Sequence, residues 1–370
     1  MNAYLHIPFC SSFCSYCDFT SFEGREDLLS SYVETLIAEI GASDLVGPLR
    51  TVYFGGGTPS LLDPGALGRI MEVLRSKAGI AEGAEISMEA NPDTVDSSRL
   101  QGYRREGVTR LSLGAQTSHR DLLALLSRCH DWGQVERAVH GAREAGFGDV
   151  NLDLMIGLPG QTVPRVRETL GSALSLEPDH LSVYALQLEP RTPLEAKVKS
   201  GLSLPGDDET ADQYEEVQRV LEAAGYGQYE VSNWCRPGRE CRHNLAIWQG
   251  EDYWGFGVSA VGTQGLVRKT NTSELDRYLD LPSRGLSATA EQEEIPPQVR
   301  DFERLMLMLR TRWGAPEALV EGCRKGVSAS AQDRFQAILD QGWLVLEKGR
   351  YHPAPSGYLR LNSVLETLLV

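Results

Sequence analysis

The chain has 370 residues, a formal net charge of −15 and seven cysteines. Its acidity argues against a general nucleic-acid binder, because such affinity depends on phosphate neutralisation by Lys and Arg. It holds no run of about 18 apolar residues, so no membrane-spanning helix is predicted. The start lacks the basic and apolar regions of a secretory signal. We therefore expect a cytoplasmic protein.

Short β-rich runs alternate with amphipathic helical patterns over the first part of the chain. The predicted strands are Ala3–Ile7, Thr51–Phe54, Glu85–Met88, Arg110–Leu113, Asn151–Ile156 and Leu181–Leu186. The predicted helices between them include Leu28–Ile40, Ala66–Lys77, Trp132–Ala145 and Val166–Leu176. This alternation predicts an α/β fold of parallel βα units. Six units suit a partial (βα)6 barrel of the TIM type, with its chemistry at the C-terminal ends of the strands.

Changes in composition along the chain suggest four segments. We predict a barrel over 1–235, a segment over 236–286 rich in Cys, His and aromatic residues that packs on the barrel, a polar linker over 287–297, and a C-terminal domain over 298–370. The elements expected in that last domain are helices at Val299–Arg312 and Ala329–Leu339, a hairpin of Leu344–Glu347 and Tyr351–Pro353, and a helix at Tyr358–Leu369. These elements predict a small α+β, winged-helix-like cap.

Three cysteines follow the first predicted strand at CxxxCxxC spacing, namely Cys10, Cys14 and Cys17. Thiolates at this density are typical of an iron–sulfur cluster. A structural zinc site needs four closed ligands, and no fourth Cys or His follows in the loop. A 4Fe-4S cubane held by three cysteines leaves one iron open to another ligand. Zinc binding and three buried core thiols are the alternatives.

Polar residues and glycines gather after the other strands. Gly55–Gly57 lack Cβ atoms, so their backbone could approach a ligand closely or form a simple tight turn. Glu89 ends an apolar run, where it would either cap the next turn or accept from a ligand. Asp153 presents the same choice between ligand and buried structural partner. Arg128 alone reads as a solvated helix end.

The cysteine trio resembles the signature of the radical S-adenosylmethionine (SAM) superfamily. Longer motifs narrow the resemblance to the oxygen-independent coproporphyrinogen III oxidase group: YFGGGTPS at 53–60, EANP at 89–92, LGAQ at 113–116, DLMIGLPGQT at 153–162 and CRHN at 241–244. The resemblance covers most of the chain. It implies that SAM chelates the open iron and that the reduced cluster cleaves SAM to a 5′-deoxyadenosyl radical.

Carried over residue by residue, the resemblance implies a set of SAM contacts. These are Tyr4, Tyr16, Gly56, Gly57, Thr58, Glu89, Gln116, Arg128, Asp153, Ala185 and Val261. Arg128 thereby gains a role that its local sequence does not suggest.

Two branches of the group differ at the cluster loop. The oxidase branch has a fourth cysteine in CxxxCxxCxC and a long extension before the cluster. Here Asp18 and Phe19 follow Cys17, and nine residues precede Cys10. Both features resemble the heme chaperone HemW branch. That branch also carries an HNxxYW motif, matched by His243–Trp248 except that Ile247 replaces the tyrosine.

An imidazole is a common axial heme ligand, so His243 is a candidate. The aromatic and glycine residues of Tyr253–Ala260 could accept a porphyrin face. Alternatively, His243 hydrogen-bonds within the fold and those rings pack on the barrel. Cys235, Cys241 and His243 could also hold a metal, although their spacing fits no standard zinc pattern. Cys129 and Cys323 are expected to be ordinary buried thiols.

The resemblance therefore implies a SAM-binding 4Fe-4S protein that carries heme to acceptor hemoproteins. Its implied partners are heme, an acceptor hemoprotein and an electron donor to the cluster. A homodimer is compatible with the sequence, and no nucleic-acid partner is expected. Oxidative decarboxylation of coproporphyrinogen III is the alternative function, and radical modification of RNA is the second alternative, which the acidity disfavours.

Overall fold

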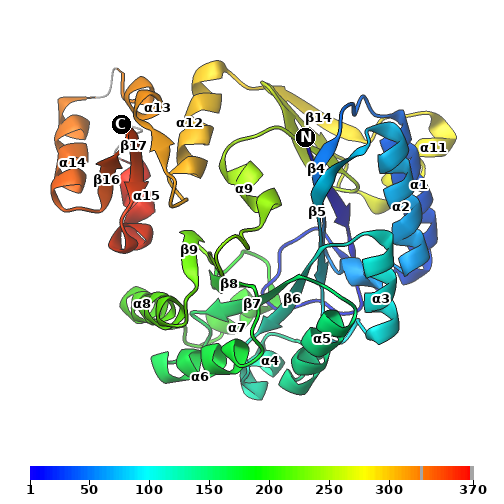
Figure 1. Ribbon diagram of the computed structural model, residues 1–370, viewed down its shortest axis with the longest axis horizontal. Helices are drawn as coiled ribbons and strands as arrows, with labels where there is room; N and C mark the ends of the chain where they lie inside the picture. Colours follow the sequence, from blue (N-terminus) through cyan, green and yellow to red (C-terminus); the bar gives the residue numbers. More distant parts are fainter. Residues whose placement is uncertain (326–327, 367–370) are drawn as a thin grey trace.

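A computed structural model describes residues 1–325 and 328–366. Twelve strands form one curved sheet in the order β14-β13-β12-β11-β1-β4-β5-β6-β7-β8-β10-β9 (Figure 1). The strands that pair in parallel at its centre are β1 (Asn2–Ile7), β4 (Leu49–Gly56), β5 (Ile80–Ala90), β6 (Arg110–Gln116), β7 (Asp149–Ile156) and β8 (His180–Ala185). The prediction of six parallel βα strands is confirmed.

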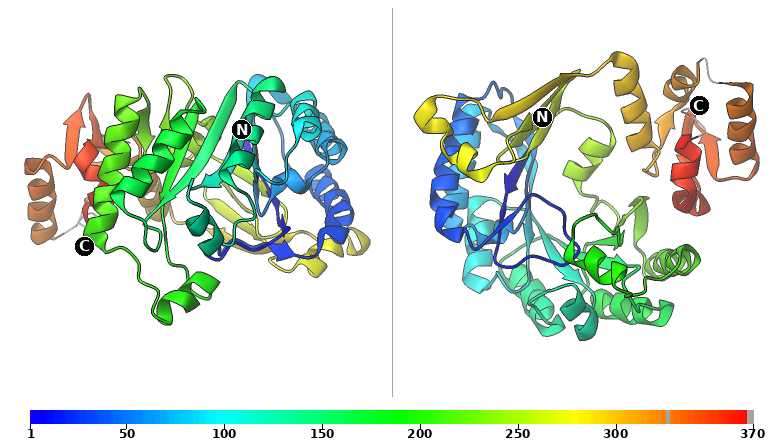
Figure 2. Two further views of the ribbon diagram at one scale, coloured as in Figure 1. Left: turned by 90° about the horizontal axis from the view of Figure 1, so that it is seen from below. Right: turned by 180° about the vertical axis from the view of Figure 1, so that it is seen from behind.

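Helices cover the outer face of this sheet (Figures 1 and 2). They are α1 (Leu29–Ala42), α2 (Pro64–Lys77), α3 (Ser97–Glu106), α5 (Trp132–Glu144), α6 (Val163–Leu174) and α8 (Asp207–Ala223). Two short helices, α4 (Arg120–Leu125) and α7 (Pro193–Lys199), instead lie beside the loop that contains Ser15, whose backbone bonds to Leu126 and Leu194. Asp63, Asp96 and Asp131 cap α2, α3 and α5 by accepting a backbone N–H in the first turn. Such caps satisfy amide donors that the helix leaves free. Every residue of β6 is buried, as expected for a parallel strand covered on both faces.

The segment 236–286 contributes to the main sheet rather than only packing on it. Its elements are α9 (Arg242–Trp248), β11 (Tyr253–Phe256), β12 (Val261–Gln264), β13 (Val267–Asn271), α10 (Leu275–Leu279) and α11 (Leu281–Arg284). Strand β11 pairs in parallel with β1, and β12 and β13 extend the sheet beyond it. At the other end, β10 (Asn233–Cys235) pairs antiparallel with β8, and β9 (Gly227–Glu230) pairs antiparallel with β10. Helix α9 lies at the open side of the curved sheet (Figure 1).

The segment 287–297, predicted to be a linker, instead contains strand β14 (Thr289–Glu294). This strand pairs with β13 and places Glu293 opposite Arg268, whose nearest N–O distance is 3.5 Å. The polar sequence TAEQEE has little intrinsic tendency to form a strand. It does so because an edge strand needs only one paired side and tolerates charged side chains on the other.

The C-terminal domain has its own apolar core around Leu305, Phe335, Leu344 and Val364. Its elements are α12 (Pro297–Met308), β15 (Ala315–Pro316), α13 (Glu317–Cys323), α14 (Ala329–Asp340), β16 (Leu344–Glu347), β17 (Arg350–Pro353), η3 (Pro355–Arg360) and α15 (Leu361–Glu366). The predicted hairpin is confirmed. The single helix expected from Tyr358 is instead a 3-10 turn followed by α15, and residues 367–370 lie outside the described range.

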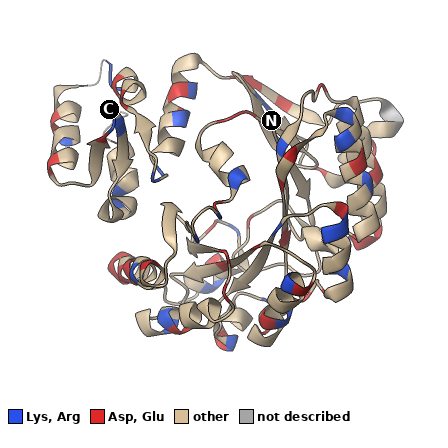
Figure 3. Ribbon diagram, in the orientation of Figure 1, with Lys and Arg blue, Asp and Glu red and all other residues tan. Residues whose placement is uncertain are grey.

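Lys and Arg residues alternate with Asp and Glu residues along the outer helices (Figure 3). Within the described residues, no helix combines the length and apolar character needed to cross a bilayer.

Candidate functional site

The cysteine loop leaves the barrel at the end of β1. Cys10 closes the short strand β2 (Phe9–Cys10), which pairs with β3 (Phe22–Glu23), and Cys14 and Cys17 lie in the loop between these strands. Ser15 anchors the loop to the end of α4: its amide donates to the Leu126 carbonyl at 3.0 Å and its hydroxyl to the Leu125 carbonyl at 2.8 Å. The three thiols are therefore held at the strand ends by contacts far apart in sequence.

Thr58 and Gly57 both lie next to the Cys10 thiol. The Thr58 hydroxyl donates to Cys10 Sγ at 3.7 Å. A Cβ atom at Gly57 would lie 2.9 Å from the same sulfur and 2.7 Å from the Phe9 carbonyl oxygen. Only glycine leaves room for the thiol at this point.

Arg128 is the cationic centre of the site. One guanidinium nitrogen donates to Cys14 Sγ at 3.2 Å, and the other donates to Asn91 Oδ1 at 2.7 Å and to the Gly114 carbonyl at 2.8 Å. The side chain thus connects the cysteine loop with the ends of β5 and β6. The sequence alone suggested a solvated helix end, and that interpretation is wrong.

Glu89 lies at the end of β5 and faces the glycine loop. It accepts from the Tyr53 hydroxyl at 2.8 Å and from the Gly56 amide at 3.2 Å. Burial raises the pKa of Glu89 to about 7, with a smaller contribution from Asp153, and the two hydrogen bonds only partly oppose this rise. A carboxyl group with this pKa can hold or release a proton near neutrality.

Asp153 is held by structural partners within the barrel. It accepts from Ser112 Oγ at 2.9 Å and from Asn151 Nδ2 at 2.8 Å. Burial raises its pKa.

Gln116, at the end of β6, has a φ of 61°, in the left-handed region that non-glycine residues seldom adopt. Such strained positions are frequent at functional sites.

The remaining predicted contacts are more scattered. Tyr4 Oη is hydrogen-bonded to His6 Nδ1 at 3.0 Å, and its ring would lie 2.9 Å from a Cβ at Gly55. Tyr16 packs against the small apolar cluster that includes Leu126. Val261 lies on β12, where its carbonyl oxygen approaches Gly255, the residue paired with Tyr4. Ala185 ends β8 beside Ile156.

His243 is a buried, hydrogen-bonded residue of α9. The residue is 4% exposed, its Nδ1 lies 2.8 Å from Thr51 Oγ1, and its ring stacks on the Tyr53 ring with centroids 5.0 Å apart. Burial lowers its pKa to about 4. The imidazole ring is therefore not accessible to a porphyrin iron in this conformation. The alternative interpretation, a histidine that is hydrogen-bonded within the fold, describes it better.

Glu85 secures the start of α9 from inside the barrel. Its carboxylate accepts from the amides of Arg242 at 3.0 Å and His243 at 2.9 Å, and Arg110 Nε donates to it at 3.1 Å. Burial would raise the pKa of Glu85, but Arg110 and the two amides outweigh it and hold the pKa below its usual range.

The other cysteines differ from expectation. Cys235 and Cys241 are buried, but Cys129 is exposed and Cys323 is half-buried, so the expectation of two buried thiols is wrong for both. In the described part of the chain, no three Cys, His, Asp or Glu side chains are arranged to hold a single metal ion. The suggested metal set of Cys235, Cys241 and His243 is thus not formed.

Sequence reasoning missed several residues of the site. Asn91, Tyr53 and Ser112 each contact a predicted functional side chain. Asn91 and Tyr53 lie in the EANP and YFGGGTPS motifs, so their position in those motifs was an available signal. Arg110 and Glu85 carried no such signal in the sequence. Both lie in strands, and only the sheet topology shows which strands are their neighbours.

The curved parallel sheet with a three-cysteine loop at its strand ends defines a radical SAM protein, and the model of the radical SAM superfamily matches residues 4–173. Coproporphyrinogen III oxidase (HemN) from Escherichia coli, a radical SAM enzyme, has a similar fold, with a TM-score of 0.84, 24% identity, and coverage of 99% of this chain and 89% of that one.

Full-length relatives define the family further. Proteins named heme chaperone HemW are 37% identical over 375 residues in Mycobacterium tuberculosis (strain H37Rv) and 33% identical over 377 residues in Escherichia coli (strain K12). The matches cover 100% of this chain and 94% and 98% of the two relatives. A Bacillus subtilis relative of the same name is 37% identical and covers 96% of the chain. The chain belongs to the HemW family.

The superfamily implies a 4Fe-4S cluster and SAM, and the residues present fit both. Three thiols without a fourth ligand suit a cubane with one open iron, and Gly57 leaves space beside Cys10. Burial raises the pKa of Cys17 to about 11, so without a bound cation this thiol stays protonated. The cluster, when bound, supplies an electron to the ligand on its open iron. Arg128, Glu89 and the Gly55–Gly57 backbone would hold and orient that ligand.

Proposed function

We propose that this protein binds heme and transfers it to acceptor hemoproteins. The supporting observation is the full-length likeness, 32–37% identical, to relatives named heme chaperone HemW. Phe19 adds to it, because it stands where the oxidase branch has a fourth cysteine. The alternative, oxidative decarboxylation of coproporphyrinogen III, draws on the fold shared with HemN.

The two functions are separated by offering each substrate to the same reconstituted protein. With cluster and SAM present and under reducing, anaerobic conditions, we expect no conversion of coproporphyrinogen III to protoporphyrinogen. The same preparation should bind heme and pass it to an apo-hemoprotein. Turnover of coproporphyrinogen III, or failure to bind heme, would overturn the proposal.

The ligand of the heme iron is a separate part of the proposal. If His243 binds the iron, α9 must first leave its place on the barrel, because Thr51 and Tyr53 engage the ring in the closed position. Heme binding would then be slow and limited by this opening. His243→Ala should change the Soret band, whereas His140→Ala, at an exposed position of α5, should not. Identical Soret bands in all three proteins would place the iron ligand elsewhere.

A further inference from the structure

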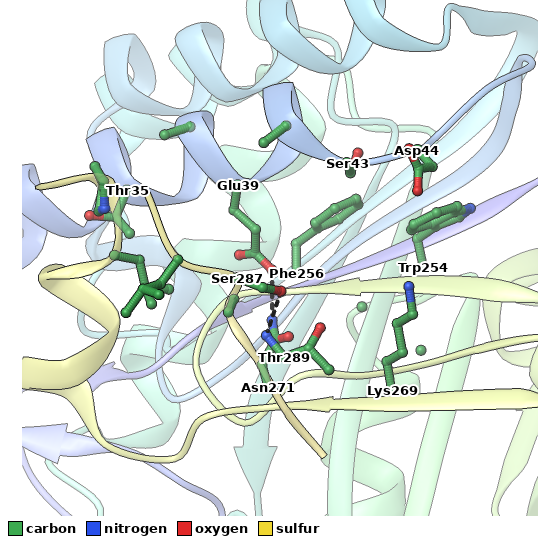
Figure 4. A pocket seen from close by; sticks show the side chains of 18 of the residues that line it. Thr35, Glu39, Ser43, Asp44, Trp254, Phe256, Lys269, Asn271, Ser287 and Thr289 are labelled. Carbon is green, nitrogen blue, oxygen red and sulfur yellow. Dashed lines mark hydrogen bonds between the residues drawn. The ribbon is translucent and has the colours of Figure 1, made fainter. Parts of the chain in front are cut away.

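A cavity of about 450 Å³ lies on the far side of the sheet extension from His243, between α1, β11–β13 and α11. Its volume is within the range typical of small-molecule sites. Figure 4 shows the side chains that line it. The SAM site described above shares none of its lining residues.

The cavity has an apolar and aromatic wall. Trp254 and Phe256 alternate along β11, so both side chains point to the same face of the sheet. Their rings are nearly parallel, at 8°, with centroids 6.1 Å apart. Ala38 from α1 and Leu286 from the loop after α11 complete this lining. Leu286 is 57% exposed, so its apolar side chain is accessible to a ligand at the rim of the cavity.

The back of the cavity is polar but already satisfied. Glu39 accepts hydrogen bonds from the Gly257 amide at 2.9 Å, from Asn271 Nδ2 at 2.6 Å and from Tyr278 Oη at 2.5 Å. These bonds tie α1 to β13 and α10. Glu39 therefore has a structural role and does not offer a free group to a ligand.

Lys269 supplies the free charge. It lines the cavity, is half-buried, and makes no ion pair or side-chain hydrogen bond with any residue that the structure describes. Its amine points toward the Trp254 side chain, which lies between it and the exposed carboxylate of Asp44 (Figure 4). An unpaired ammonium beside an aromatic wall is matched by a flat, apolar ligand that carries a carboxylate.

We propose that this cavity is a porphyrin-binding site that holds the macrocycle by its flat face and its propionate edge. The proposal rests on the heme-carrier function above and specifies where the cargo docks. None of the lining residues is a His, Cys, Met or Tyr that could ligate iron. The site therefore recognises the porphyrin ring and not its metal, and it leaves the iron available to a ligand elsewhere.

Metal-free protoporphyrin IX tests this directly, because His243 has no iron to bind in it. Titration of the cluster-loaded protein should show saturable binding by fluorescence. Ala38→Phe, at an exposed position of α1 that faces the cavity, should weaken binding by about tenfold or more by filling the space. Lys269→Met should weaken it roughly three- to fivefold, the range of a partly exposed ion pair.

Matched variants control for unrelated effects. Ala223→Phe places the same ring at an exposed position of α8, and Lys348→Met removes a charge from the C-terminal hairpin. Both should bind protoporphyrin IX like the unmodified protein, and so should His243→Ala.

The outcomes separate this proposal from the carrier function. If the protein binds and transfers heme but Ala38→Phe and Lys269→Met bind protoporphyrin IX normally, the cavity is not the docking site and the carrier function stands. If saturable binding of protoporphyrin IX is absent while heme binds, the cavity proposal is likewise overturned. If neither porphyrin binds, the carrier function itself fails.

Discussion

Arg128 donates a hydrogen bond to Cys14 Sγ at 3.2 Å, although the two residues are 114 positions apart in the chain. The same guanidinium holds Asn91 and the Gly114 carbonyl. It therefore sets the position of the cysteine loop relative to the ends of two barrel strands. A planar donor with a fixed fork is needed to reach three acceptors at once.

Arg128→Lys should keep the charge but lose part of this network. Hydrogen bonds to charged groups contribute about 1.5–3 kcal/mol each, so we expect a measurable loss of stability in urea. The cluster should assemble but be released faster, as measured by the iron that remains after gel filtration. Arg120→Lys, at an exposed position of α4, is the control. Equal iron retention in both variants would contradict the role of Arg128.

Cys14→Ala should abolish the cluster. Anaerobic reconstitution of the unmodified protein should yield about four irons and four sulfides per chain, the composition of a cubane. Cys129→Ala removes an exposed thiol that contacts Ser12 of the same loop at 3.3 Å, and it should load normally. A fully loaded Cys14→Ala protein would show that other residues hold the iron.

Gly56→Ala should weaken SAM binding while the cluster persists. Gly56 has a φ of 116°, and a Cβ atom there would lie 2.7 Å from the His6 ring, so the end of β4 must shift. Gly83→Ala introduces similar backbone strain, at a φ of 67°, where the new Cβ meets nothing within 4 Å. Calorimetry should show reduced SAM affinity only for Gly56→Ala. Equal affinities would remove Gly56 from the SAM site.

SAM affinity should depend on pH through Glu89. With a folded-state pKa of about 7, the carboxyl is mostly protonated at pH 6 and mostly ionised at pH 8. The ionised form is the stronger hydrogen-bond acceptor for a ligand amine or hydroxyl. Affinity should therefore rise from about pH 6 to about pH 8, and Glu89→Gln should flatten this rise. A pH profile unchanged by the substitution would exclude Glu89 as the titrating group.

The same pKa has a consequence for folding. The folded chain retains the Glu89 proton to a higher pH than the unfolded chain, whose carboxyl titrates near 4.5. The folded state therefore binds more protons between about pH 4.5 and about pH 7, and the Glu89 contribution to stability decreases as pH rises through this window. In Glu89→Gln, urea unfolding should lack this decrease. The same slope in both proteins would contradict the raised pKa.

Features that depend on local sequence could be predicted without the structure. The spacing of Cys10, Cys14 and Cys17 needs only a short loop. The short apolar, β-rich runs of the six parallel strands arise because most of their residues are buried on both faces of the sheet. The predicted helix Trp132–Ala145 matches α5 to within one residue at its end, because a capping box of Asp131 and Gln134 marks its start.

Features that depend on distant partners were decided only by the tertiary structure. Strand β14 forms because β13 offers it an unpaired edge, and no local signal in Thr289–Glu294 reveals that edge. His243 looked like an open metal ligand, but Thr51, Tyr53 and Glu85 enclose it from two other strands. The hydrogen-bond partners of Arg128 are likewise distant in sequence, and only the fold brings them to it. Pairing and burial bring together residues far apart in the chain, and periodicity carries no information about which ones meet.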